Sequence, residues 1–235
     1  MSHNRMQSEY RTTASMQGSG CSSGLILPPL AVLFITGLLA LFANSPMVTV
    51  SAASLPASQP GEIPVTGYTQ TSISPIFTAE VQYWGEHILA WSAEFGLDPD
   101  LAATVMQIES CGYQQAVSSA GAMGLFQVMP FHFSAEDAPM DPGTNARRGL
   151  AYLALSLERA GGDPRLALAG YNGGIGVIAR GESTWSEQTH RYVKYGGPIY
   201  ADAAAGLTTS GAVYEWYSRY GASLCRQAHD SLGLP

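Results

Sequence analysis

Residues 98–109 read DPDLAATVMQIE and predict a helix with one buried face. Asp98 followed by Pro99 is a helix-start signature, because the aspartate can accept first-turn N–H groups and the proline already has the helical φ. Apolar side chains then recur at spacings of four and three, at Leu101, Val105 and Ile108. Residues with these spacings share one face of a helix. The pattern therefore predicts an amphipathic helix over 99–109.

The same helix start recurs at two further pairs, Asp141-Pro142 and Asp163-Pro164. Each pair precedes an apolar, alanine-rich stretch, which predicts helices over 144–160 and 165–171. Upstream, apolar residues at helical spacing predict a helix from about Ala79. Strand signals are weak and limited to a short β element around 115–125. We therefore expect one mainly helical globular domain over 80–235.

The residues before this domain divide into three segments of different composition. Residues 1–24 are polar and carry two arginines, whereas 25–43 contain no charge and have about the 20 residues that a bilayer-spanning helix needs. Because the arginines precede this run, the positive-inside rule places residues 1–24 in the cytoplasm and the domain outside it. Residues 44–79 are rich in Ser, Thr and Pro, which predicts a flexible, disordered linker.

Two interpretations of the uncharged run 25–43 remain open. A transmembrane anchor is favoured because the run exceeds the 7–15 apolar residues of a usual signal peptide. The alternative is a cleaved signal sequence, since small residues at 50–52 offer a cleavage site. The first interpretation makes the protein a single-pass membrane protein with an extracytoplasmic domain, and the second makes it secreted.

Composition excludes several classes of function. Lys+Arg is 11 against Asp+Glu 18, a net charge of -7, and the only lysine is Lys194. Such a chain is a poor nucleic-acid binder, because few cations are present to contact phosphates. Lys194 follows a valine, so no Gly-Lys of a phosphate-binding P-loop exists. With three cysteines, no CxxC pair and no HExxH, we expect no metal site and no cofactor.

Glu109 is the residue of the 99–109 helix with the most chemical interest. It lies four residues after Val105 and so borders the apolar stripe. A carboxyl group in that position is partly desolvated, which raises its pKa and suits it to general acid catalysis. The alternative is a surface glutamate in the last turn of a helix, and periodicity alone does not decide between the two.

The residues after Glu109 form three blocks that occur in a known family. They are Glu109-Ser110-Cys111-Gly112-Tyr113 with Ala116–Pro130, then Leu168–Gly174, then Gln188–Val193. Together they resemble the Glu-Ser, Ala-Val-Ser, Gly-Leu, Gln, Met-Pro, Ala-Tyr-Asn and Thr-x-x-Tyr-Val motifs of the lytic transglycosylase domain in the soluble lytic transglycosylase and goose-type lysozyme group. The resemblance covers roughly residues 80–195.

The resemblance implies a lysozyme-like α+β fold and a role for several residues. Glu109 matches the catalytic acid, and Ser118 and Gln127 match residues that line the sugar groove. Tyr171 matches a tyrosine close to the catalytic glutamate, and Asn172 its neighbour in the motif. A second motif glutamate of the family falls at Gln188 here.

The implied reaction is cleavage of the N-acetylmuramic acid–N-acetylglucosamine bond of peptidoglycan, with formation of 1,6-anhydro ends. Most glycosidases use two carboxyl groups, but a lytic transglycosylase needs one, because the C6 hydroxyl of its substrate is the nucleophile. Glu136, Asp137 and Asp141 are weak candidates for a second. The alternatives are a muramidase that uses water, a non-catalytic peptidoglycan-binding protein, and a membrane-tethered envelope scaffold.

Cys111 and Cys225 both fall in the part that we expect outside the cytoplasm, where disulfides persist. A bond between them would join the end of the Glu109 helix to the C-terminal segment. The alternative is a pair of buried free thiols. Cys21 would lie on the reducing side of the membrane.

Overall fold

The computed structural model describes residues 70–235. The predicted tail 1–24, the predicted anchor 25–43 and the predicted linker up to residue 69 lie outside the described residues. Among residues 70–235, no helix has the length and apolar character to cross a bilayer.

The described residues are mainly helical, as predicted. The helices are α1 (Ala79–Gln82), α2 (Gly85–Glu94), α3 (Pro99–Glu109), η1 (Pro130–His132), α4 (Pro142–Arg159), α5 (Pro164–Gly173), α6 (Gly176–Arg180), η2 (Glu182–Thr184), α7 (Glu187–Ala204), α8 (Gly211–Trp216), η3 (Tyr217–Gly221) and α9 (Ala222–Leu232). Within 70–235, β pairing is limited to isolated bridges from Met123 to Val117 and to Val128. The expected β element near 115–125 is therefore reduced to these bridges.

The three Asp-Pro pairs start helices as predicted. Asp98, Asp141 and Asp163 each accept a hydrogen bond from a first-turn backbone N–H, at 2.8–2.9 Å. The prolines that follow them open α3, α4 and α5. The helix over 99–109 has the expected bounds, whereas α4 starts two residues before 144 and α5 ends two residues after 171. The expected helix from Ala79 is interrupted at Tyr83 and Trp84, so it forms α1 and α2.

The folded part begins before the predicted end of the linker at residue 79. Ile73, Ile76 and Phe77 are buried in the core. The backbone N–H of Ser74 donates to the Asp100 carboxylate at 2.7 Å, which ties this segment to the first turn of α3. The linker boundary was wrong here, because the polar composition of 44–79 as a whole concealed three apolar residues close together.

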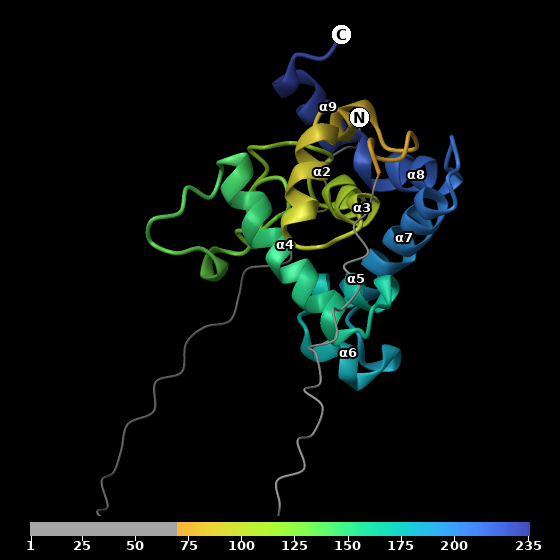
Figure 1. Ribbon diagram of the computed structural model, residues 1–235. Coiled ribbons are helices and arrows are strands. Elements are labelled where there is room, and N and C mark those ends of the chain that lie inside the picture. Colours follow the sequence, from red (N-terminus) through yellow and green to blue (C-terminus); the bar gives the residue numbers. More distant parts are fainter. Residues whose placement is uncertain (1–69) are drawn as a thin grey trace, which may run out of the picture. The chain divides into compact units, whose positions relative to one another are not determined.

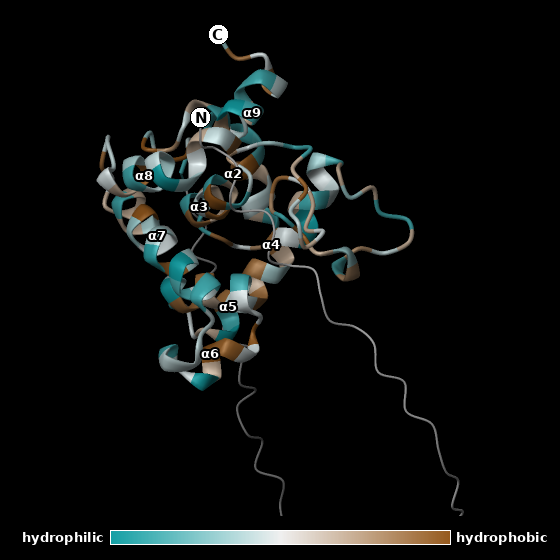
Figure 2. Cartoon of the chain, turned by 180° about the vertical axis from the view of Figure 1, so that it is seen from behind, coloured by the Kyte–Doolittle hydropathy of each residue, from teal (hydrophilic) through white to brown (hydrophobic). Residues whose placement is uncertain are grey.

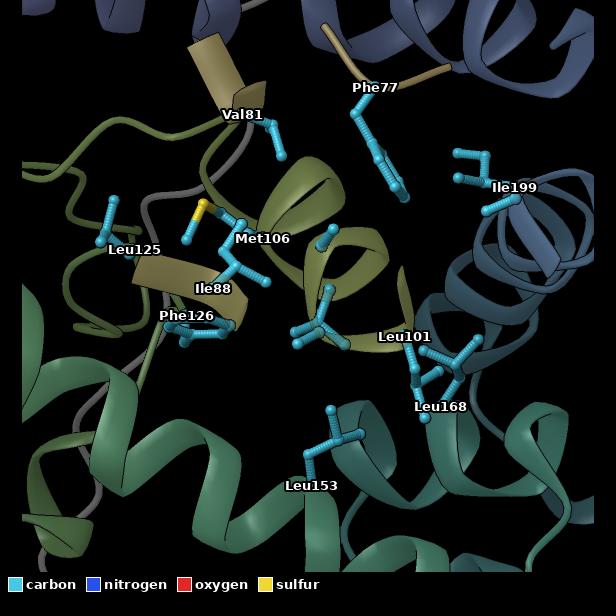
Figure 3. Packing of buried hydrophobic residues seen from close by; sticks show 14 of the residues in the cluster. Phe77, Val81, Ile88, Leu101, Met106, Leu125, Phe126, Leu153, Leu168 and Ile199 are labelled. Carbon is cyan, nitrogen blue, oxygen red and sulfur yellow. The ribbon is translucent and has the colours of Figure 1, made fainter. Parts of the chain in front are cut away.

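Helix α3 lies in the core of the described domain. It packs against α1, α2 and α7, and α5 packs against α4, α6 and α7 (Figure 1). Leu101, Val105 and Met106 of α3 are fully buried, and Figure 3 shows Leu101 and Met106 among core residues from α2, α4, α5 and α7. Both faces of α3 are thus covered along most of its length, which fixes the position of its last residue, Glu109.

The outer helices are amphipathic. In α4 the buried residues recur at spacings of three and four, at Asn145, Ala146, Gly149, Leu150, Leu153 and Ser156. Figure 2 shows hydrophilic and hydrophobic residues alternating along α4 and α7. This pattern is expected of helices that cover a core on one side and meet solvent on the other.

A single buried side chain from α4 holds the loop that follows α3. Asn145 accepts the N–H of Phe126 at 2.8 Å and donates to the carbonyl groups of Met123 and Pro139 at 2.8 and 3.0 Å. Gly124 has φ +76°, and a Cβ there would overlap the Asn145 amide. The glycine is therefore required both by backbone conformation and by the close approach of Asn145.

Candidate active site

The end of α3 is joined directly to the loop that carries the sequence motif. Ser110 follows Glu109, is buried, and donates its hydroxyl to the Leu125 carbonyl at 2.6 Å. The same hydroxyl accepts the N–H of Gly112 at 3.1 Å. The Glu-Ser pair of the motif thus has a local explanation, because the serine positions the helix end that carries the glutamate.

The Glu109 carboxyl lies in a desolvated environment. Burial raises the pKa of Glu109 from 4.5 to about 8, and a hydrogen bond with Tyr192 opposes the shift without cancelling it. The residue as a whole is only half-buried, so solvent reaches part of it. Glu109 therefore carries a proton near neutral pH and is accessible to a ligand, which are the two requirements of a general acid.

Tyr171 of α5 lies close enough to Glu109 for the two groups to interact electrostatically. Its hydroxyl donates to the Phe126 carbonyl at 2.7 Å, which connects α5 to the loop after α3. Burial raises the pKa of Tyr171 well above its ordinary value, and the Glu109 charge adds to the rise. A neutral phenol thus stands beside the carboxyl group.

Tyr192 of α7 is a site residue to which the sequence analysis gave no role. Burial and then the Glu109 charge raise the pKa of Tyr192 well above its ordinary value. Its buried hydroxyl interacts with the Glu109 carboxyl group and lowers the pKa of that group. The signal was present in the sequence, because Tyr192 is the tyrosine of the third motif block, Gln188–Val193.

Gln127 lines a small pocket together with Tyr171. The pocket measures about 50 Å³, and His132, Arg148 and Tyr152 also contribute to its wall. The Gln127 amide nitrogen donates to the Ala116 and Gly124 carbonyls at 3.1 and 3.0 Å. These bonds hold a residue whose φ of 45° is unusual for a side chain other than glycine. Gln127 therefore fixes the loop conformation and also faces the pocket.

Ser118 and Asn172 make local hydrogen bonds. The Ser118 hydroxyl accepts the N–H of Ala122 at 3.0 Å, within the turn 118–122. The Asn172 side chain accepts the Thr189 hydroxyl at 3.2 Å, which joins α5 to α7. These bonds give both residues a structural role, and contacts with a sugar remain a prediction for them.

Of the other carboxylates near the motif, Asp137 and Asp141 have structural partners, and Glu136 is exposed. Asp137 pairs with Arg148 at 2.7 Å, and this hydrogen bond is the main reason why the pKa of Asp137 is lowered. Asp141 caps α4. Gln188, which stands where the family has a second glutamate, is exposed on the first turn of α7.

The raised pKa of Glu109 predicts that Glu109→Gln stabilises the fold. Above the unfolded pKa of 4.5, folding must keep or restore a proton that the unfolded chain loses, and this cost grows until the pH passes the folded pKa of about 8. We therefore expect the variant to gain about 1–3 kcal/mol at pH 7 and nothing at about pH 4. Urea unfolding at both pH values measures the difference; an equal gain at both would contradict the raised pKa.

These features define a class of protein: a helical domain in which a half-buried glutamate with a raised pKa, at a helix end, stands beside two tyrosines. Residues 86–193 match the family model described as "Transglycosylase SLT domain". This stretch of the chain belongs to the lytic transglycosylase SLT family, and it contains Glu109, Gln127, Tyr171 and Tyr192.

Two curated relatives are also named as transglycosylases. The chain is 36% identical over 142 residues to the transglycosylase of Enterobacteria phage PRD1, covering 55% of this chain and 51% of the phage protein. It is 32% identical over 139 residues to membrane-bound lytic murein transglycosylase C of Klebsiella pneumoniae, covering 50% of this chain and 38% of that protein. The chain thus spans about half or less of each relative's length.

Among solved structures, the chain is similar to an inactive mutant of lytic transglycosylase Slt from Pseudomonas aeruginosa. The sequence identity is 20% and the TM-score is 0.38. The similarity covers 63% of this chain and 24% of the Slt chain.

Proposed function

We propose that the protein is a peptidoglycan lytic transglycosylase that cleaves the N-acetylmuramic acid–N-acetylglucosamine bond, with Glu109 as general acid and then general base. The observation that carries the proposal is the burial of the Glu109 carboxyl group, which raises its pKa to about 8 and so favours the protonated form near neutral pH. The family of residues 86–193 and the names of the relatives support the substrate class.

The first step breaks the glycosidic bond. The Glu109 carboxyl group donates its proton to the bridging oxygen, the bond from that oxygen to C1 of the muramic acid breaks, and the N-acetylglucosamine side leaves as an alcohol. The 2-acetamido group of the sugar stabilises the cationic C1. The neutral side chains of Tyr171 and Tyr192 lie near the carboxylate that this step leaves behind.

The second step forms the anhydro ring. The Glu109 carboxylate takes the proton of the C6 hydroxyl, O6 bonds to C1, and the carboxyl group is restored. This step is intramolecular in the sugar, which gives O6 an advantage that water lacks. One carboxyl group thus performs both proton transfers. This is consistent with the structural roles of Asp137, which pairs with Arg148, and Asp141, which caps α4.

The mass of the sugar product tests the proposal. Purified sacculi digested with the full-length protein should release muropeptides that end in 1,6-anhydro-muramic acid, lighter by one water than muramidase products. Reducing ends would instead show hydrolysis by the same site. Binding to sacculi with no released sugar would favour a non-catalytic peptidoglycan-binding protein.

We also propose that residues 25–43 anchor the protein, with the domain on the outer side of the membrane. The uncharged run and the arginines before it support this orientation. In intact spheroplasts, external protease should degrade the domain and leave a membrane-bound N-terminal fragment. A soluble mature protein that begins near residue 52 would show signal cleavage instead.

A further inference from the structure

Four side chains with metal-binding atoms lie near the contact between α1 and α9, and one of them, Cys111, comes two residues after Glu109 in sequence. A carboxylate oxygen of Glu80 and the sulfurs of Cys111 and Cys225 lie within 4.8 Å of one another, and all three residues are buried. His229 adds a ring nitrogen, Nδ1, at 3.1 Å from the Glu80 carboxylate. In the structure the two sulfurs form a disulfide.

The types and spacing of these groups fit one metal ion. Two thiolates, an imidazole and a carboxylate are ligands that Zn²⁺ accepts in a tetrahedral site. Zinc bonds of 2.0–2.3 Å place neighbouring ligand atoms about 3.3–3.8 Å apart. To meet this geometry the two sulfurs, which are bonded in the structure, must move apart, whereas the Glu80 carboxylate oxygen already lies within 4.8 Å of both sulfurs and 3.1 Å separates that carboxylate from His229 Nδ1.

We propose that the reduced protein binds one Zn²⁺ ion through Cys111, Cys225, His229 and Glu80, so that metal and disulfide are alternative closures of the same junction. A dithiol reductant converts the disulfide into two thiols and is itself oxidised to a cyclic disulfide. Binding of Zn²⁺ then displaces one proton from each thiol. The neutral imidazole and the ionised carboxylate complete the coordination.

A hydrogen bond or ion pair between Glu80 and His229 accounts for only part of the cluster. That pair alone needs no sulfur nearby, yet both sulfurs lie within 4.8 Å of the same carboxylate oxygen. Cys225 and His229 are also four residues apart on α9, so they project from the same face of that helix. The convergence of four side chains with three ligand types, from three segments, is what points to a metal.

The site would join the family domain to its two flanking segments. Cys111 lies inside residues 86–193, whereas Glu80, Cys225 and His229 lie outside this stretch. The inference therefore concerns features of this chain that the family match does not include. It does not depend on the proposed enzymatic activity.

Cobalt binding to the reduced, full-length Cys21→Ser protein tests the proposal. A phosphine reductant keeps Cys111 and Cys225 reduced without oxygen, and Co²⁺ is added as the probe. We expect one equivalent to bind and to give the sulfur-to-cobalt charge-transfer band and the intense visible bands of tetrahedral Co²⁺. Zn²⁺ should displace Co²⁺ and so abolish these bands. At a free concentration about 100 times its Kd, Zn²⁺ should raise the Tm of the reduced protein by roughly 5–10 °C. The oxidised protein should bind no metal.

Matched variants identify the ligands. Glu80→Gln and His229→Ala should each weaken Zn²⁺ binding by at least about 10-fold, and Cys225→Ser should remove the charge-transfer band. His190→Ala is the control, because His190 also lies near a glutamate, at 3.9 Å from Glu182, but is not part of the cluster that contains Cys111 and Cys225. Circular dichroism verifies that each variant is folded. Absence of cobalt bands in the folded, reduced parent would overturn the proposal, as would equal affinity of the parent, Glu80→Gln and His229→Ala.

Discussion

Glu109→Gln is expected to lower the rate of glycan cleavage by at least about 10³-fold, because general acid catalysis contributes about 10²–10⁴-fold and the same residue also serves as the base. Glutamine has nearly the shape of the protonated side chain but has no proton to transfer. The helix that carries it is buried on both faces and is closed by Ser110, so the substitution should leave the fold intact. Binding to sacculi should change little.

Initial rates of muropeptide release from sacculi measure this loss. Gln188→Glu is the control, because this exposed residue on the first turn of α7 restores the family's glutamate without entering the buried site. Its rate should stay within a few-fold of the parent. Near-parental activity in Glu109→Gln would remove Glu109 from the catalytic role, whatever the product of the parent enzyme.

The helices could be predicted from sequence where local signals and burial agree. At Asp98, Asp141 and Asp163 the capping aspartate and the following proline act within one turn, so the helix start does not depend on distant residues. The helical spacing of Leu101, Val105 and Ile108 likewise predicts which face of the helix is buried. Glu109 could be placed beside a desolvated surface for the same reason, since its position relative to Val105 is fixed by the helix.

The contacts made across the fold could not be read in this way. Tyr192 stands in the third motif block, but local periodicity does not indicate that it interacts with Glu109 from α7. Asn145 holds the 123–126 loop from α4, and its neighbourhood likewise has no pattern that indicates this target. The end of the linker was misassigned for a related reason. Ile73, Ile76 and Phe77 are ordered by the core that they meet, so composition averaged over 44–79 gave too little weight to them.

Loss of the disulfide is expected to cause the largest change in stability. Cys111 and Cys225 are bonded in the structure, at a sequence separation of 114. In the chain-entropy model, a disulfide that closes a loop of that length adds about 5 kcal/mol to the free energy of unfolding. Removal of a native disulfide typically costs about 2–5 kcal/mol of stability. The double variant Cys111→Ser/Cys225→Ser should therefore lose about 3–5 kcal/mol and roughly 10 °C in Tm.

Thermal unfolding of the oxidised parent and the double variant, both with a metal chelator, measures this effect without a contribution from zinc. Cys21→Ser is the control and should unfold as the parent does, because Cys21 lies outside the bonded pair. Thiol labelling of the denatured, unreduced Cys21→Ser protein should find no reactive cysteine. Two labelled cysteines, or a double variant with the parental Tm, would mean that the α3–α9 junction is held by packing alone. In that case the end of the Glu109 helix would owe its position to Ser110 and the buried faces of α3, since Cys111 is only two residues beyond the carboxyl group.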